Sequence, residues 1–398
     1  MKILFLTLVR IENLEDHGIY HDLLRKFRDN EHEVIVVCPS ERKYRLKTGL
    51  YSNENVKILN VWTPNIQKTN VIEKGISMIL IEYLYYFAIK RYINFSDFDL
   101  ILYSTPPITF TNLIQKLKQS SNAITYLLLK DIFPQNAVDL KLFKSDGFLY
   151  KYFRAKEILL YQISNFIGCM SPANYDYLVK NNQQLETSKL EINPNTIEID
   201  FDFPEVDLDL YSKYNIPGDK IIYLFGGNLG VPQGINYLMQ NIAHCKSIKE
   251  AFFLIVGDGT EFDLLKKWID LEHIENALLI KEIPKNDFDG ILRLADVGLI
   301  FLNPRFTIPN FPSRLLSYMQ HKMPVICATD TVSDIGEITS LNNFGYSCLT
   351  SDLDSFYNFV VKLLDIDLRV NMGYSSFNYL IEHYSVDVTF DKIVEKVK

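Results

Sequence analysis

Short apolar runs alternate with longer amphipathic segments along most of the chain. The segments between the runs, for example Tyr20–Asn30 and Ile108–Gln119, have the length and apolar spacing of helices. Strands that alternate with helices in this way predict a parallel sheet with crossover helices. In the first half, the runs with the length and β-branched content of buried strands are Lys2–Leu8, Glu33–Cys38, Lys57–Trp62, Asp99–Tyr103, Ile124–Lys130 and Phe166–Met170.

The alternation restarts in the second half of the chain. Between the two series, the acidic segment Glu198–Asp209 contains Pro204 and few helix formers, as is typical of a linker. The last segment, from about Asn371, has a helical pattern and no further strand. We therefore expect one domain over residues 1–193, a second over 194–375, and a C-terminal helix over 376–398 that packs back on the first domain. The second series of strands is Ile221–Phe225, Ala251–Val256, Ala277–Lys281, Val297–Leu302 and Pro324–Ala328.

Length and composition agree with two soluble domains. The chain has 398 residues, 47% of them hydrophobic and 23% charged, which fits two domains of about 100–200 residues each. Its 41 Lys and Arg stand against 49 Asp and Glu, a net charge of −8. An acidic chain lacks the basic surface that general nucleic-acid binding needs, so we expect no nucleic-acid partner.

The cysteines and the apolar stretches point to the cytoplasm. The five cysteines lie far apart, without a C-x-x-C pair, as in proteins of a reducing compartment. The first apolar run, Ile3–Val9, is followed at once by acidic residues and reads as a strand, not a signal peptide. The longest apolar stretch, Gly75–Ile89, has 15 residues and contains Glu82, so it is shorter than the roughly 18–20 residues that span a bilayer.

Two glycine-rich turns follow strands of the second series and precede helices. They lie at Gly226–Gly234 and Gly257–Gly259, and glycine in such a turn lets backbone amides approach a phosphate. The first turn matches neither the dinucleotide G-x-G-x-x-G nor a Walker loop, and alone it fits a plain tight turn equally well. Asp258 in the second turn also fits an N-terminal cap of the next helix.

A third cluster joins a strand to a helix. It runs from Asn303 to Met319 and places Ser313 and Arg314 in the first helical turn. A diphosphate there would meet free backbone N–H groups, the helix dipole and a bidentate guanidinium. The plain alternative is that Ser313 caps the helix and Arg314 is solvated.

In order and spacing, these three clusters resemble the C-terminal domain of family 4 glycosyltransferases, which have the GT-B fold. The greatest resemblance is to the bacterial branch that builds capsule and O-antigen polysaccharide. That branch typically shows G-N-L-G-x-x-Q-G, a strand ending in G-D-G, A-D-V-G-L, a P-S-K-L loop and a G-x-P-V strand. The matching segments here are Gly227–Gly230 with Gln233 and Gly234, Gly257–Gly259, Ala295–Leu299, Pro312–Leu315 and Lys322–Val325.

The first half is similar to the same family more loosely, so that the resemblance covers roughly Met1–Gly345. It implies two Rossmann-like α/β domains that face a central cleft, with C-terminal helices that close the structure. The donor, a UDP-sugar, would bind mainly to the second domain, and the sugar would be transferred with retention of configuration. One departure affects the donor ribose, because Pro309 and Ser317 replace the two glutamates of the E-x7-E motif of many members.

Asp131 is the carboxylate expected to act on the acceptor. It ends an apolar strand, at the edge where open α/β sheets place ligands. The resemblance directs its loop to the donor, so we expect Asp131 to orient or deprotonate the acceptor hydroxyl; the alternative is a cap of the turn before Pro134. We expect no metal and no cofactor, because a cationic side chain and a helix N-terminus can stabilise a departing diphosphate without a metal.

One segment is locally basic and aromatic. Lys141–Lys156 contains five Lys and Arg residues, one acidic residue, Asp146, and five aromatic residues. Such a segment can lie on an anionic membrane surface, or form a core helix with a solvated basic edge. The lipid-linked acceptors of the family favour peripheral association with the inner face of the cell membrane.

The chemistry expected from these residues is glycosyl transfer to a lipid-linked or saccharide acceptor in surface polysaccharide biosynthesis. The alternatives are a nucleotide-sugar 2-epimerase of the same fold and a two-domain sugar-binding protein without activity. The expected catalytic residues are Asp131 and Arg314. The residues expected to bind substrate are Gly18, Gly227, Asn228, Gly230, Gly257, Asp258, Gly259, Glu282, Asn310, Pro312, Ser313 and Leu315.

Overall fold

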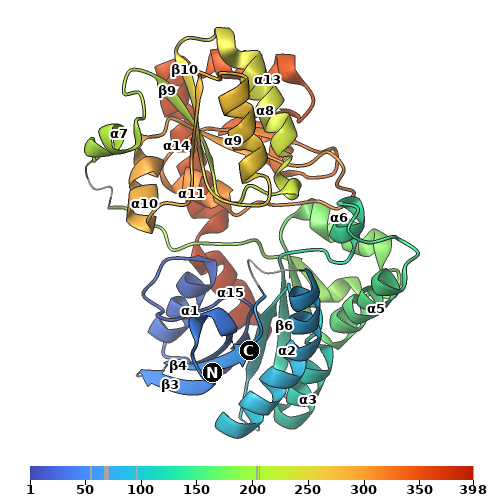
Figure 1. Cartoon of the computed structure of the whole chain (residues 1–398). Coiled ribbons are helices and arrows are strands. Elements are labelled where there is room, and N and C mark those ends of the chain that lie inside the picture. The colour runs from blue at the N-terminus through green and yellow to red at the C-terminus, as the bar shows by residue number, and fades with distance from the viewer. Residues whose placement is uncertain (54–55, 67–70, 96, 203–204, 206, 398) are drawn as a thin grey trace. The chain divides into compact units, whose positions relative to one another are not determined.

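The computed structural model divides the chain into two compact units (Figure 1). Unit 1 comprises Met1–Glu198 and Ser385–Lys398, and unit 2 comprises Ile199–Tyr384. The structure describes residues 1–53, 56–66, 71–95, 97–202, 205 and 207–397. Each unit has one sheet with parallel strands and crossover helices, so the predicted α/β class with two parallel-sheet domains is confirmed.

Unit 1 is built on an eight-stranded sheet with the order β3-β4-β2-β1-β5-β6-β7-β8. All neighbouring pairs are parallel except β3 with β4, which form an antiparallel pair. The strands are β1 (Lys2–Leu6), β2 (Glu33–Glu41), β3 (Gly49–Asn53), β4 (Val56–Thr63), β5 (Leu100–Ser104), β6 (Ile124–Leu129), β7 (Phe166–Cys169) and β8 (Leu190–Ile192).

The helices of unit 1 cover both faces of this sheet. Strand order reverses between β1 and β5, and right-handed crossovers then place α1 on one face and α2, α3 and α5 on the other. Helix α2 packs against α3, and α3 against α5 (Figure 1). The helices are α1 (Ile19–Asp29), α2 (Val71–Tyr92), α3 (Thr111–Ser121), α4 (Gln135–Asp139), α5 (Phe148–Ile163), α6 (Pro172–Asn181) and α15 (Val386–Val397).

The last helix, α15, belongs to the core of unit 1 although 186 residues of unit 2 precede it in the chain. Its apolar face, made of Val386, Phe390 and Ile393, is buried with β1, β2 and α1 in one hydrophobic cluster. The rings of Phe390 and Phe27 lie 5.1 Å apart between centroids. Unit 1 therefore depends on the C-terminal residues for a complete core.

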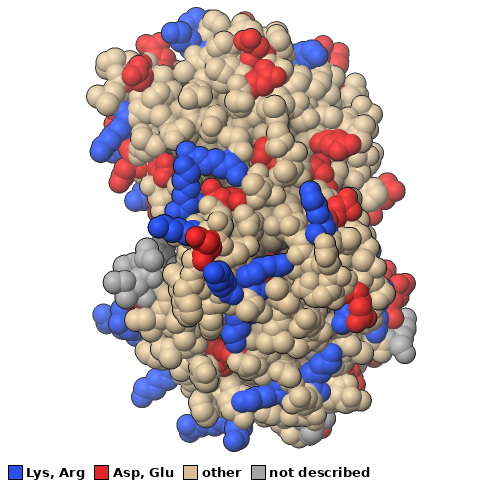
Figure 2. Space-filling view, turned by 90° about the vertical axis from the view of Figure 1, so that its right-hand side faces the viewer, with Lys and Arg blue, Asp and Glu red and all other residues tan. Residues whose placement is uncertain are grey.

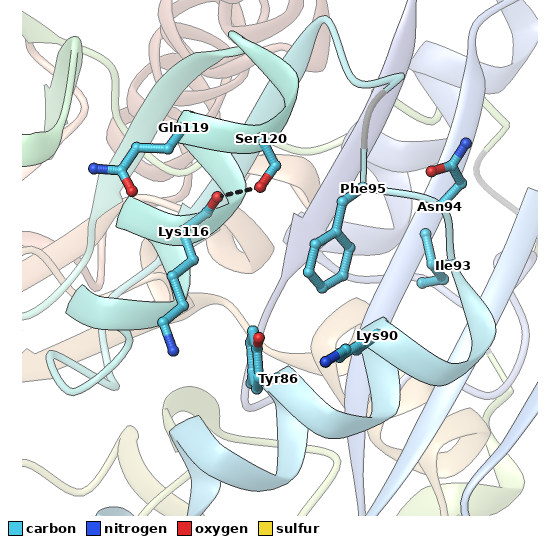
Figure 3. A pocket seen from close by; sticks show the side chains of 8 residues that line it. All are labelled: Tyr86, Lys90, Ile93, Asn94, Phe95, Lys116, Gln119 and Ser120. Carbon is cyan, nitrogen blue, oxygen red and sulfur yellow. Dashed lines mark hydrogen bonds between the residues drawn. The ribbon is translucent and has the colours of Figure 1, made fainter.

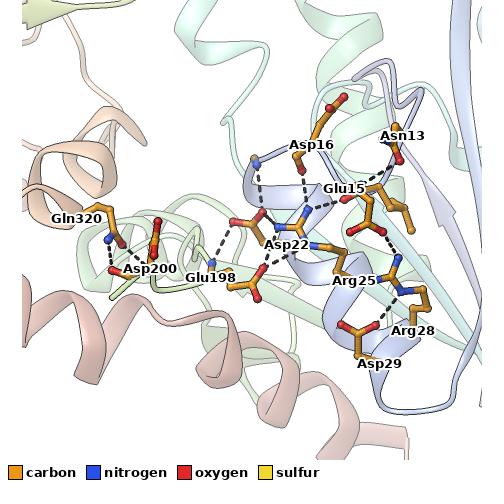
Figure 4. Close-up of polar contacts among 12 residues, drawn as sticks. Asn13, Glu15, Asp16, Asp22, Arg25, Arg28, Asp29, Glu198, Asp200 and Gln320 are labelled. Atoms are coloured by element: carbon orange, nitrogen blue, oxygen red, sulfur yellow. Dashed lines mark hydrogen bonds and ion pairs between the residues drawn. The ribbon is translucent and has the colours of Figure 1, made fainter. Parts of the chain in front are cut away.

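Arg25 links a buried ion pair within α1 to Glu198, the residue where the chain leaves unit 1 (Figure 4). The Arg25 guanidinium donates to Asp22 Oδ1 at 2.6 Å and to Glu198 Oε2 at 2.9 Å. It also donates to the backbone oxygens of Leu14 and Asp16 at 2.5 and 2.6 Å. Because Arg25 and Asp22 are both buried, each needs the other to compensate its charge.

Unit 2 has a six-stranded parallel sheet with the order β11-β10-β9-β12-β13-β14. Its strands are β9 (Ile221–Gly226), β10 (Ala251–Val256), β11 (Ala277–Ile280), β12 (Val297–Phe301), β13 (Val325–Thr329) and β14 (Gly345–Leu349). Its helices are α7 (Asp209–Tyr214), α8 (Ile235–His244), α9 (Phe262–Leu271), α10 (Lys285–Leu294), α11 (Arg314–Gln320), α12 (Ile335–Leu341), α13 (Leu353–Lys362) and α14 (Ile366–Tyr384).

The surface carries both charges. On the face drawn in Figure 2, basic and acidic side chains are interspersed with wide uncharged areas between them. None of the helices in the described part of the chain has both the length and the hydropathy of a membrane-spanning segment.

Candidate functional site

The candidate donor site of unit 2 is built from loops at the carboxyl ends of β9, β10 and β12. In the first loop, Gly227 has φ 112° and Gly234 has φ 59°, backbone conformations that glycine adopts most readily. The Gln233 side chain closes this loop, since its Oε1 accepts hydrogen bonds from Asn228 Nδ2 at 3.1 Å and from Gly230 N at 3.2 Å.

The second loop packs backbone to backbone on the first. A Cβ atom on Gly257 would lie 1.8 Å from the Gly227 oxygen, and one on Gly259 would lie 2.3 Å from the Leu229 oxygen. Leu229 N donates to the backbone oxygen of Asp258 at 2.9 Å. Both glycines are therefore needed for close approach of the two loops.

The backbone amides of these loops differ from the expected phosphate cradle. The N–H groups of Gly227, Leu229 and Gly257 donate to backbone oxygens, that of Gly230 donates to Gln233, and that of Gly259 donates to the Asp258 carboxylate. Hydrogen bonds within the protein therefore occupy these five amides.

Arg314, the first residue of α11, supplies the positive charge. The carbon of its guanidinium lies 4.4 Å from the centre of the Phe225 ring, and its Nη2 would lie 3.7 Å from a Cβ on Gly227. Its Nη1 is buried and has no hydrogen-bond partner among the residues described. The Arg314 residue as a whole is half-buried, and desolvation by burial lowers its pKa from the ordinary value.

The plain alternative for this cluster describes the structure only in part. Ser313 occupies the N-cap position of α11, but its side chain makes no capping hydrogen bond. Arg314 has a buried guanidinium nitrogen, where the alternative expects a solvated side chain. Asp258 lies ahead of α9, whose N-cap residue is Glu261, so Asp258 does not occupy the cap position either.

The other expected donor residues have different surroundings. Asn310 donates its backbone N–H to Ser333 Oγ at 2.9 Å, and Pro312 is half-buried. Leu315 is fully buried in the core of unit 2, and Glu282 is exposed just after β11. The loops thus bring Gly227 and Arg314 together, while Leu315 faces the interior.

Two polar residues that fix these loops received no role from the sequence, although Asn303 opens the third cluster. Asn303 follows β12 and donates through Nδ2 to the Val231 oxygen at 2.8 Å, which ties this loop to the first glycine loop. Asp330 follows β13 and accepts hydrogen bonds from Ser333 N at 2.7 Å and Ser333 Oγ at 2.9 Å. Each stands directly after a parallel strand, the position that could have identified it.

In unit 1, Asp131 lies two residues after β6. Thr105 Oγ1 holds the local main chain by accepting from Lys130 N at 2.9 Å and Asp131 N at 3.1 Å. The Asp131 carboxylate accepts no hydrogen bond within the described residues, so it does not cap the turn before Pro134. Asp131 is an exposed residue, and desolvation by the protein around its carboxyl group raises the pKa from the ordinary 3.8 to about 6.

The pKa values of two neighbours of this loop are also shifted. Burial lowers the pKa of Lys130 from 10.5 to about 7 and raises the pKa of Tyr20 to about 12. Gly18 stands at the N-cap of α1, and its N–H donates to Asp22 Oδ1 at 3.2 Å. This amide is therefore used within the protein. Among the described residues, no group of three or more His, Cys, Asp or Glu could hold a metal ion.

Comparison with known proteins relates this chain to glycosyltransferases. A curated relative, the probable glycosyltransferase WbjE of Pseudomonas aeruginosa, is 23% identical over 338 residues, which are 84% of this chain and 82% of WbjE. Sucrose-phosphate synthase from Thermosynechococcus elongatus has a similar structure, with a TM-score of 0.76 and 13% identity over 99% of this chain and 98% of the synthase. HepE of Anabaena, solved in complex with UDP, has a TM-score of 0.68 and 14% identity over 100% and 99% of the two chains.

The sequence of unit 2 gives the most direct assignment. Residues 209–377 match the family model described as glycosyl transferases group 1. This range contains the glycine loops and Arg314. The chain is thus related to glycosyltransferases of the GT-B fold, and its residues 209–377 correspond to the group 1 glycosyl transferase domain.

Proposed function

We propose that this protein transfers a sugar from a UDP-sugar to an acceptor hydroxyl. The observation that carries the proposal is the half-buried Arg314 cation, which lies against the Gly227 loop and whose buried Nη1 has no hydrogen-bond partner among the described residues. A diphosphate oxygen is a suitable partner, because a charge-assisted hydrogen bond would compensate the buried charge. HepE, which shares the fold, was solved with UDP.

Arg314 has a direct chemical role in this reaction. As the bond to the anomeric carbon breaks, negative charge develops on the departing diphosphate, and a preorganised cation lowers the energy of that state. The stacked Phe225 ring keeps the guanidinium in place before substrate arrives. We propose a reaction without a divalent metal or cofactor and with retention of configuration.

Asp131 is proposed to act on the acceptor. Its pKa of about 6 leaves it ionised at neutral pH, yet close enough to the working pH for proton transfer. Its carboxylate has no protein hydrogen bond to break before it accepts one from a sugar hydroxyl. This role requires the Asp131 carboxylate to lie within hydrogen-bond distance of the acceptor hydroxyl. A structure with bound acceptor would test that distance.

The acceptor is proposed to be lipid-linked, so that the enzyme works at the inner face of the cell membrane in surface polysaccharide biosynthesis. In the segment Lys141–Lys156, Leu142 and Phe148 are 72% and 81% exposed. The exposed cations of this segment are Lys141, Lys144 and Lys151. Arg154 instead binds Asn182 Oδ1 at 2.6 Å, and Lys156 binds Thr111 Oγ1 at 3.1 Å.

The three exposed lysines define a test of this segment. Binding to anionic vesicles should weaken as salt rises, because screening limits the attraction to a Debye length of about 8–10 Å. The triple variant Lys141→Glu/Lys144→Glu/Lys151→Glu should sediment less with such vesicles at low salt than the parent protein. Equal sedimentation of both proteins would exclude the segment as a docking surface.

The central experiment identifies donor and product together. Thermal unfolding with a panel of UDP-, GDP- and dTDP-sugars should show stabilisation by a UDP-sugar, since a ligand that binds the folded state raises the apparent stability. The stabilising donor is then incubated with and without a saccharide acceptor. Transfer gives a new glycoside only with acceptor, whereas conversion of the donor sugar without acceptor would show a 2-epimerase.

A further inference from the structure

The outward face of α2 carries a continuous stripe of exposed apolar side chains. The stripe consists of Ile76, Ile79, Leu80, Tyr83 and Phe87, which are between 41% and 63% exposed. Their spacing of three or four residues along the helix, with one adjacent pair, places them on one side. Single exposed apolar residues are normal on a soluble protein, but a contiguous stripe marks an interaction surface.

The opposite side of α2 is buried, so the helix cannot rotate to bury the exposed stripe without exposing that side. Ile81, Tyr85 and Ile89 have no solvent exposure. The Tyr85 hydroxyl donates to the Thr7 backbone oxygen at 2.9 Å and fixes the rotation of the helix. A helix that is apolar on both sides is suited to a position between a protein core and a second apolar medium.

A groove between α2 and α3 adjoins the stripe (Figure 3). One part, a cavity of about 560 Å³, is lined by Tyr86, Lys90, Phe95 and Lys116 among others. A second part of about 370 Å³ shares Tyr86 and Lys116 and extends to Tyr83 of the stripe. In Figure 3 the ammonium groups of Lys90 and Lys116 end on either side of the Tyr86 ring, and Lys116 Nζ lies 4.3 Å from the ring centre.

The charge of this face is positive. Within the described residues, Lys90 and Lys116 form no ion pair, and α3 contains no acidic residue. The acid that lines the groove, Glu82, is buried and accepts hydrogen bonds from Leu113 N at 2.9 Å and Asn112 Nδ2 at 3.1 Å. Beyond the groove, Asp97 is bound by Asn94 Nδ2 at 3.0 Å.

We infer that this α2–α3 face docks on an anionic lipid bilayer. The stripe enters the boundary between headgroups and acyl chains, and Lys90 and Lys116 bind lipid phosphate in the groove. A second copy of the chain fits less well, because a twofold contact through the same face brings its lysines toward one another. The inference rests on the proposed membrane association and adds the α2–α3 face of unit 1 to the segment Lys141–Lys156 as a second docking surface.

Co-sedimentation of the full chain with vesicles tests this surface. The vesicles contain phosphatidylglycerol and phosphatidylcholine in equal parts, or phosphatidylcholine alone. The stripe variant is Ile79→Ser/Tyr83→Ser/Phe87→Ser, and the groove variant is Lys90→Gln/Lys116→Gln. A matched control, Leu271→Ser/Leu341→Ser/Ile366→Ser, removes apolar residues of unit 2 that are 64–76% exposed.

We expect the parent and the control to bind the mixed vesicles equally. The stripe variant should partition at least about tenfold less, because buried apolar area drives insertion. The groove variant should lose about fivefold for each lysine on mixed vesicles, and nothing on phosphatidylcholine alone. Thermal unfolding and UDP binding should remain those of the parent in both variants, which separates docking from folding and from the transfer site.

Three results would overturn the inference. If the parent does not sediment with mixed vesicles, the proposed membrane association falls with it, while UDP binding still tests the transfer reaction separately. If the stripe and groove variants bind like the parent and the Lys141/Lys144/Lys151 variant does not, association stands and its surface is the other one. If the parent is a dimer in sedimentation velocity and the stripe variant is a monomer, the occupant is a second copy.

Discussion

Replacing Arg314 with methionine should weaken UDP binding and stabilise the free protein at the same time. Methionine preserves much of the packing on Phe225 but removes the charge and all the donors. With ligand, the change removes charge-assisted hydrogen bonds to the diphosphate, which contribute about 1.5–3 kcal/mol. Since each 1.4 kcal/mol corresponds to tenfold, the dissociation constant for UDP should rise by about 10–150-fold.

Without ligand, the same change removes a buried donor that has no partner. An unsatisfied buried group costs about 1–3 kcal/mol, while the lost cation–π contact at 4.4 Å contributes about 0.5–1 kcal/mol in the other direction. The net gain is about 1 kcal/mol, which should raise the melting temperature of unit 2 by about 2–4 °C.

Titration calorimetry with UDP and thermal unfolding measure the two effects on one preparation. The matched control is Arg305→Met, because Arg305 lies in the same connection between β12 and α11 but is exposed. The control should leave both quantities unchanged. An unchanged dissociation constant for Arg314→Met would remove Arg314 from the donor site, and a lower melting temperature would show that its guanidinium is satisfied in the free protein.

Three further outcomes are expected. Activity should survive EDTA, and a complete loss that added Mg²⁺ or Mn²⁺ restores would refute metal-free transfer. The rate should rise with pH through about 6 as Asp131 ionises, and Asp131→Asn should lose activity and this pH step but still bind UDP. The free energy of unfolding should change with pH in the opposite direction to the rate. Because the folded-state pKa of Asp131 is raised above 3.8, the stability that this group contributes is lost as pH rises from about 4 through 6. Arg25→Met should destabilise unit 1 by about 3–5 kcal/mol in urea unfolding, because it leaves the charge of buried Asp22 uncompensated. The control Arg28→Met breaks contacts at exposed carboxylates and should cost less than about 1 kcal/mol. Similar losses of stability in both variants would refute this prediction.

Local pattern was sufficient for most strands of both sheets. The run Ala251–Val256, for example, has the same bounds as β10, because a parallel strand buried on both faces is a continuous apolar run. The pattern failed for β3, whose sequence Gly-Leu-Tyr-Ser-Asn has little strand character. This strand exists because it pairs with β4, for example Leu50 opposite Leu59, and such pairing is tertiary information.

The candidate site was predictable by motif but not by environment. The motif placed Arg314 beside Pro312 and Ser313, but its contact with Phe225 depends on the pairing of β9 with β12, which are far apart in the sequence. The motif also suggested free amides, whereas several amides of the two glycine loops donate to other groups of the protein. Asp330 lies outside the motifs and Asn303 opens the third cluster without a role, so their positions after β12 and β13 were the signal that could have assigned one.

The place of α15 in unit 1 has a consequence for biosynthesis. Residues 1–198 leave the ribosome first, but their core includes Val386, Phe390 and Ile393 from the end of the chain. Unit 2 is complete once Tyr384 has emerged. A released chain that ends at Tyr384 should therefore combine a protease-resistant unit 2 with a protease-sensitive unit 1, so that the first unit to be translated is the last to mature.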